Sequence, residues 1–127
     1  MPGHPAAGRL GRAAGLGHQR GHAVIAAVST TVASVEQASA LAAAMVERRL
    51  AACAQLTPID SVYVWQGQLQ REAEVRVLFK TTLQRKAALM AAIAQCHPYE
   101  LADLHAETLA DVHPPYADWV AASVADA

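Results

Sequence analysis

Five consecutive residues in the second half of the chain bring four reactive side chains together. The stretch "CHPYE" at positions 96–100 holds a thiol, an imidazole, a phenol and a carboxylate around one proline. Thiolate and imidazole are ligands that soft and borderline transition metals prefer, so the stretch predicts a metal site or a catalytic cluster. A third interpretation is a helix stop, because the residue before a proline is pushed out of the helical region.

Cys96 and His97 carry the metal interpretation of this stretch. Adjacent side chains diverge by about 100° on a helix, so both residues reach one ion only if the helix has already unwound. The alternative is that both continue the apolar stripe of Ile93 and are packed. An enzyme is not predicted, because no motif places a base and an orienting group beside Cys53 or Cys96.

The elements that position these residues follow from the spacing of apolar side chains. Residues 23–31 form a nearly continuous apolar run, which is typical of a central strand buried on both faces. Helical spacing covers residues 34–49, where Ser34 and Gln37 fit a capping box. A second helix is predicted over residues 83–97.

The middle of the chain, residues 50–82, predicts a long β-hairpin that turns at Gly67 and is bent or bulged at Pro58. A final strand at 101–109 and a helix from 114 complete the order β-α-β-β-α-β plus a C-terminal helix. This order predicts a ferredoxin-like α+β fold with one antiparallel sheet and both helices on one face. The bare sheet face and the apolar hairpin favour self-association.

Composition excludes several classes of protein. The 127 residues fit one domain and carry a formal net charge of −1. Residues 1–22 hold three arginines and no acid, and we expect them to be a disordered tail before a domain at 23–127. The remaining domain is acidic, which argues against a nucleic-acid partner. No apolar run approaches the ~18 residues of a membrane helix.

Several motifs occur together in one order along the chain. These are "ERRLAAC" (47–53), "SVYVWQGQLQREAEVRVLFKTT" (61–82), "HPYE" (97–100) and "YADWV" (116–120). In this order and spacing the chain resembles the CutA family of divalent-cation-tolerance proteins over roughly residues 23–124. The resemblance implies a ferredoxin-like homotrimer, a cytoplasmic location and a role in tolerance of copper and other divalent cations.

The resemblance also implies where copper would bind. The imidazole ligand of the family corresponds to His97, and its glutamate corresponds to Asp103. The cysteine ligand corresponds to Thr30, so the soft ligand that favours copper is missing there. Cys96, beside His97, is the candidate substitute.

A second function is suggested by aromatic residues and one lysine. Tyr63, Trp65, Tyr99 and Glu100 are candidate lining residues of a cleft between subunits, and Lys80 is its candidate cation. An apolar cleft with few polar groups is the usual geometry of a small-molecule site, although trimer packing would need the same aromatics. Such a trimer would be similar to PII signalling proteins and would bind a small anionic ligand or a partner protein.

Overall fold

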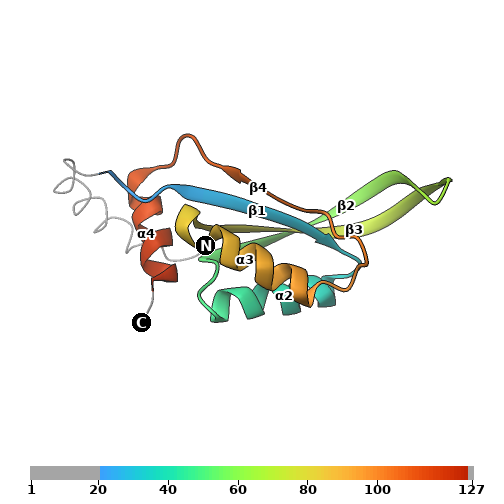
Figure 1. Cartoon of the computed structure of the whole chain (residues 1–127), viewed down its shortest axis with the longest axis horizontal. Coiled ribbons are helices and arrows are strands. Elements are labelled where there is room, and N and C mark those ends of the chain that lie inside the picture. The colour runs from blue at the N-terminus through green and yellow to red at the C-terminus, as the bar shows by residue number, and fades with distance from the viewer. Residues whose placement is uncertain (1–20, 126–127) are drawn as a thin grey trace.

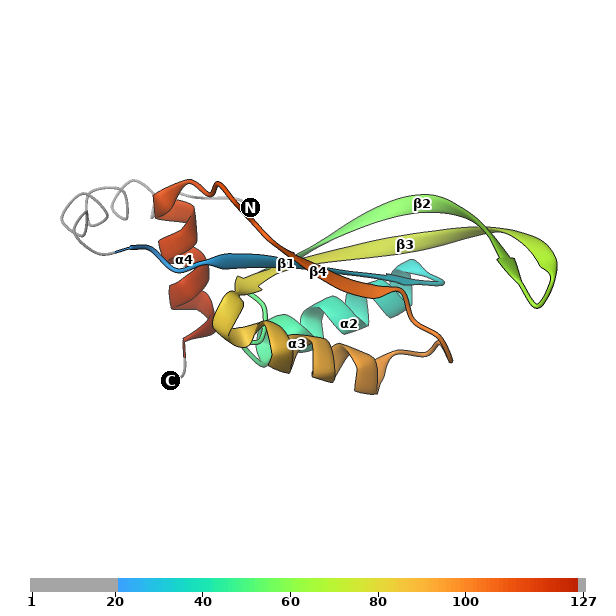
Figure 2. The same cartoon turned by 45° about the horizontal axis from the view of Figure 1, so that its top comes forward.

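The computed structural model describes residues 21–125 and shows one four-stranded sheet with helices (Figure 1). The strands lie in the order β2-β3-β1-β4, and every neighbouring pair is antiparallel. Helices α2 and α3 cover the same face of the sheet (Figure 2). This arrangement confirms the predicted ferredoxin-like βαββαβ fold. In chain order the elements are β1 (Ile25–Val32), α2 (Val35–Glu47), β2 (Cys53–Trp65), β3 (Gln68–Thr82), α3 (Leu83–Cys96), β4 (Leu104–Thr108) and α4 (Pro114–Val124).

Strand β1 is the centre of the core, as its apolar run predicts. All eight of its residues are buried, because β3 and β4 flank it and helices cover one face. On the helix face, Val28 and Val32 join Phe79 of β3. They pack against Met45 of α2 and Ile93 of α3. We call the opposite face, which α2 and α3 do not cover, the open face; α4 packs at the end of it where β1 begins, against Ile25.

The β2–β3 hairpin is the longest feature of the molecule and extends past the helices (Figures 1 and 2). Gln66 and Gly67 both have positive φ, 51° and 77°, which is the pattern of a type I′ turn. The pairing runs without interruption from Cys53↔Lys80 to Trp65↔Gln68, so the bulge predicted at Pro58 is absent. Of the predicted bend or bulge, the register excludes only the bulge, and none is needed because β2 is an edge strand, where a proline is tolerated.

The two long helices begin at side-chain caps and end where the sequence stops favouring them. Ser34 Oγ accepts from Gln37 N–H at 3.1 Å, and the Gln37 side chain accepts from Ala33 N–H at 3.0 Å. This is the capping box displaced by one residue on its return bond. Helix α2 ends at Glu47, before the predicted end at Arg49, because Arg49 takes the left-handed conformation with φ 59°.

Helix α4 lies at the end of the molecule opposite the hairpin turn (Figure 1). Its Val120 and Val124 pack with Ile25 of β1 in a second core cluster. Tyr116 and Trp119 stack at 5.7 Å and pack against that cluster. Among residues 21–125, no helix is long and apolar enough to span a membrane.

The tail predicted over residues 1–22 lies outside the described residues except for its last two. Of these, His22 is half-buried and its Nδ1 lies 2.9 Å from a carboxylate oxygen of Asp118 on α4. The ordered contacts of the domain therefore include His22.

Candidate functional site

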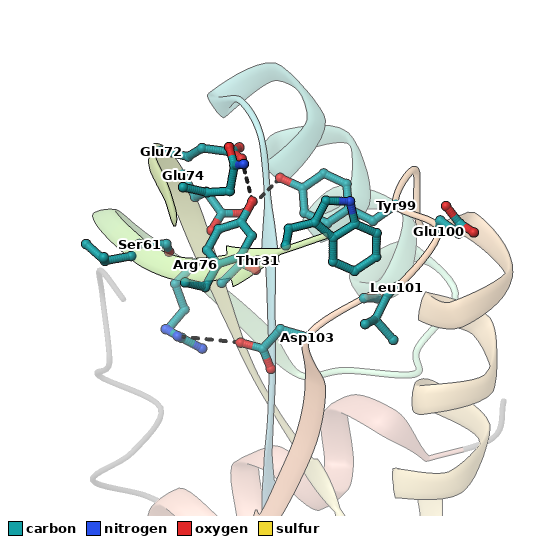
Figure 3. A pocket seen from close by; sticks show the side chains of 14 residues that line it. Thr31, Ser61, Glu72, Glu74, Arg76, Tyr99, Glu100, Leu101 and Asp103 are labelled. Carbon is teal, nitrogen blue, oxygen red and sulfur yellow. Dashed lines mark hydrogen bonds and ion pairs between the residues drawn. The ribbon is translucent and has the colours of Figure 1, made fainter. Parts of the chain in front are cut away.

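A pocket of about 860 Å³ lies on the open face, between the outer half of the hairpin and the loop after α3 (Figure 3). Four of the five predicted ligand-binding residues line it, and they come from both of these segments. The full lining is Thr31, Ser61, Val62, Tyr63, Trp65, Gln70, Glu72, Glu74, Arg76, Tyr99, Glu100, Leu101, Ala102 and Asp103.

Strand alternation places the hairpin side chains of the pocket on one face. Val75, between Glu74 and Arg76, points into the core under the helices. Successive side chains of a strand point to opposite faces, so Glu72, Glu74 and Arg76 point to the open face. Ser61 pairs with Glu72 in the β2–β3 register, which puts Tyr63 on that face as well.

Two phenol–carboxylate hydrogen bonds organise the pocket. The Tyr99 hydroxyl donates to Glu74 Oε2 at 2.8 Å, and the Tyr63 hydroxyl donates to Glu72 Oε1. The bond to Glu72 raises the pKa of Tyr63 to about 12. Burial, followed by the bond to Glu74, raises the pKa of Tyr99 above its ordinary value. Both phenols therefore stay neutral at physiological pH.

Arg76 is the cation among the residues that line the pocket. It donates to Ser29 Oγ, and its Nη2 lies 3.8 Å from Asp103 Oδ2 (Figure 3). Asp103 Oδ1 is also 2.8 Å from Nδ1 of His105. The guanidinium therefore faces Asp103 at the margin of the pocket, apart from Glu72 and Glu74.

Lys80 does not join the predicted cleft residues in this subunit. It lies six residues beyond Glu74 on β3, a separation of about 20 Å at ~3.3 Å per residue. Its Nζ is 3.4 Å from Gln55 Oε1, and it pairs with Cys53 across the hairpin. The side chain shares the open face with the pocket but stands outside it.

His97 ends α3 with extended backbone, φ −70° and ψ 133°, as expected before Pro98. Its Nδ1 accepts from the N–H of Tyr99 at 3.1 Å, so its Nε2 carries the proton. That Nε2 lies 3.0 Å from both Thr31 O and Thr30 Oγ1. Both ring nitrogens are used within the subunit, and the His97 ring meets the Tyr99 ring edge-on at 4.9 Å.

Thr30 connects the positions that the family resemblance assigns to copper. Its buried hydroxyl donates to Asp103 O at 2.7 Å and receives the Nε2–H of His97. The Asp103 carboxylate points instead to Arg76 and His105 on the open face. Cys96 is exposed, so the expectation that it packs in the core was wrong. Within residues 21–125, no three His, Cys, Asp or Glu side chains are grouped for a metal.

Glu72, Glu74 and Arg76 are pocket residues that the sequence analysis missed. Their signal was present as polar side chains alternating with Val75 and Val77. Alternation alone predicts a polar face on β3, however. It does not predict that the loop after α3 lies over this face.

The subunit is ferredoxin-like, its β2–β3 hairpin extends past the helices, and a pocket lies beside the loop at residues 97–100, which we call the HPYE loop. Together these features define a narrow class of α+β proteins. The model of the CutA1 divalent ion tolerance protein family matches residues 26–123, which is more than three quarters of the chain. The chain belongs to this family.

Named relatives agree with this assignment. Protein CutA of Mus musculus is 37% identical over 109 residues, which are 85% of this chain and 60% of that protein. The divalent-cation tolerance protein CutA of Thermus thermophilus is 37% identical over 94 residues, 73% of this chain and 91% of the relative. The solved structure of CutA from Synechococcus elongatus superposes with a TM-score of 0.79 at 39% identity, covering 81% of this chain and 92% of that one.

The chain spans little more than half of its vertebrate relatives. The matched region covers 60%, 54% and 54% of the mouse, Xenopus laevis and human proteins. It covers nearly all of the Thermus thermophilus protein.

Proposed function

We propose that this chain is the subunit of a cytoplasmic homotrimer that contributes to divalent-metal tolerance without catalysing a reaction. The observation that carries this proposal is the family match over residues 26–123. The bacterial relatives are named divalent-cation tolerance proteins, and the match covers 91% of one of them. Growth at raised copper concentration tests it, in a strain whose own member of the family is deleted. Restored tolerance on expression of the full chain is expected, and growth equal to that of the empty vector would refute the role.

The trimer is supported by apolar surface that one subunit leaves uncovered. Val62, Val64 and Leu69 near the hairpin turn are 56%, 66% and 60% exposed. They lie beyond the part of β3 that pairs with β1, which begins at Val75. Contiguous apolar surface of this kind marks an interaction site. Light scattering should therefore give about three times the chain mass of 13.4 kDa. A mass of 13.4 kDa at micromolar concentration would contradict the trimer.

Copper is the metal proposed, with His97, Cys96 and Asp103 as candidate ligands. Binding at His97 requires one ring nitrogen to give up a hydrogen bond inside the subunit. Copper titration of the full chain and of His97→Ala tests this, with His113→Ala as a matched control. Weaker binding in His97→Ala alone is expected. Equal affinity in all three proteins would remove His97 as a ligand.

A PII-like trimer that binds a small anion is the alternative function. Its candidate cation, Lys80, stands outside the pocket, and four carboxylates line that pocket. No observation in this subunit favours an anionic ligand.

A further inference from the structure

The pocket on the open face carries negative charge that this subunit does not balance. Its lining includes four carboxylates and one guanidinium, a formal charge of −3. The guanidinium belongs to Arg76, which already faces Asp103. Glu72 and Glu74 therefore have no basic partner among the described residues, and each receives only a neutral phenol hydroxyl.

Glu74 makes this imbalance significant because it is buried. Only 8% of the residue is exposed, and Tyr99 is the hydrogen-bond donor to its carboxylate. Glutamate is almost never buried to this extent unless it is paired, because desolvating the carboxylate is costly. A carboxylate in this setting, facing a cavity, has the charge complement of a cationic ligand.

The rest of the lining favours an organic cation over a bare metal ion. Tyr63, Tyr99 and Trp65 supply aromatic surface, which attracts cations through the ring faces. The volume of about 860 Å³ lies within the range of small-molecule sites, ~300–1,000 Å³. No cluster of three metal-ligating side chains exists among residues 21–125, and the pocket is far larger than one ion.

The carboxylates and the aromatic rings surround the same pocket. Figure 3 shows Glu72 and Glu74 beside the Tyr99 hydroxyl, with the Arg76–Asp103 pair set apart from them. Glu100 is exposed and points away from this group (Figure 3). Glu74 is thus the charged centre of the site, and the aromatic rings form its apolar wall.

We propose that this pocket binds a small organic ammonium ion, with its charge beside Glu74 and its carbon groups against Trp65 and Tyr99. The site is distinct in position from the proposed copper ligand, because His97 reaches Thr30 on the helix side of β1 while Glu74 lies on the open face. The proposed ligand is a cation, whereas Lys80 suggested an anionic ligand.

Choline is a suitable probe because it has an uncharged isostere, in which carbon replaces the quaternary nitrogen and the shape is unchanged. Calorimetric titration of the full chain should detect choline and show at least about tenfold weaker binding of the isostere. Equal binding of the two compounds, or no binding of choline at millimolar concentration, would overturn the proposal. The second result is also expected if a basic side chain of another subunit fills the pocket.

Single substitutions test where on the protein choline binds. Glu74→Gln keeps the shape and the acceptor for Tyr99 but removes the charge, and should weaken choline binding about tenfold or more. Trp65→Leu should weaken it about 2- to 30-fold. Glu107→Gln, an exposed carboxylate on β4 of the same face, is the matched control and should bind as the wild type does.

Two further results would count against the site. An equal loss in Glu74→Gln and Glu107→Gln would show attraction to the acidic surface as a whole. Displacement of choline by magnesium chloride, beyond the effect of sodium chloride at the same ionic strength, would show a site for inorganic cations. Copper tolerance conferred by Glu74→Gln should equal that of the wild type, which keeps this test independent of the metal proposal.

Discussion

Replacing Thr30 by valine removes one buried hydroxyl that makes two hydrogen bonds. Thr30 is fully buried in β1, and valine has nearly the same shape. The lost hydroxyl donates at 2.7 Å to the carbonyl oxygen of Asp103 and accepts from Nε2 of His97. His97 keeps a second acceptor, Thr31 O at 3.0 Å, whereas the Asp103 carbonyl loses its side-chain donor.

The size of the effect follows from that difference. A buried polar group left without a partner costs about 1–3 kcal/mol, whereas His97 exchanges one acceptor for another at little cost. Valine adds no strain at a strand position. We therefore expect Thr30→Val to lower the free energy of unfolding by about 1–3 kcal/mol. With a urea m-value of ~1–3 kcal/mol/M, the midpoint should fall by roughly 1 M.

Urea unfolding followed by circular dichroism measures this, at one fixed protein concentration because an oligomer's stability depends on it. Thr31→Val is the matched control. Thr31 is its neighbour, 5% exposed, and its hydroxyl makes no hydrogen bond within residues 21–125. The control should change stability by less than about 0.5 kcal/mol. Equal losses in the two variants would refute the account of Thr30 as a hydrogen-bond centre.

Three other features give testable outcomes. Because the pKa of Tyr63 is raised to about 12 from 10.0, its contribution to stability is present below pH 10 and lost as the pH rises through 12. Absorbance titration should show Tyr63 ionising nearer pH 10 in Glu72→Gln, and an unchanged curve would contradict the bond to Glu72. Gln66→Asn should stabilise the hairpin by up to about 1 kcal/mol, because asparagine adopts positive φ more readily; a lower melting temperature would count against the type I′ turn. The half-exposed pair of His22 and Asp118 should contribute less than about 1 kcal/mol in a double-mutant cycle, and a larger coupling would contradict its description as a weak surface pair.

The sequence predicts the fold well because its signals are local or periodic. The apolar run of β1, the cap at Ser34 and the glycine of the hairpin turn each determine one element by itself. The outcome at Pro58 depends on strand order, because a proline that would disrupt a central strand is accepted at an edge. Strand order is a property of the whole sheet, so the local signal at Pro58 could not decide whether the strand would bulge there.

The pocket was predicted in part, for a related reason. Alternation places Lys80 and Glu74 on the same face, and that much can be read from the sequence. Their separation of about 20 Å along the strand decides which of them meets Tyr99. The meeting point is set by the path of the loop after α3, which no periodic pattern records. The aromatic residues singled out from the sequence therefore line one pocket, whereas Lys80 stands outside it in this subunit.

The HPYE loop links the two proposals, because His97 positions the residue that completes the pocket. The ring of His97 accepts the N–H of Tyr99 and donates to β1, which fixes the first residue of the loop against the sheet. Tyr99 then reaches across the open face to Glu74. Where the family resemblance implies a cysteine ligand, Thr30 supplies a hydroxyl that holds His97 in this orientation. A copper ion at His97 would need the nitrogen that now orients Tyr99 or the one that donates to β1. Metal binding there would therefore cost the subunit one of the hydrogen bonds that fix the start of the loop.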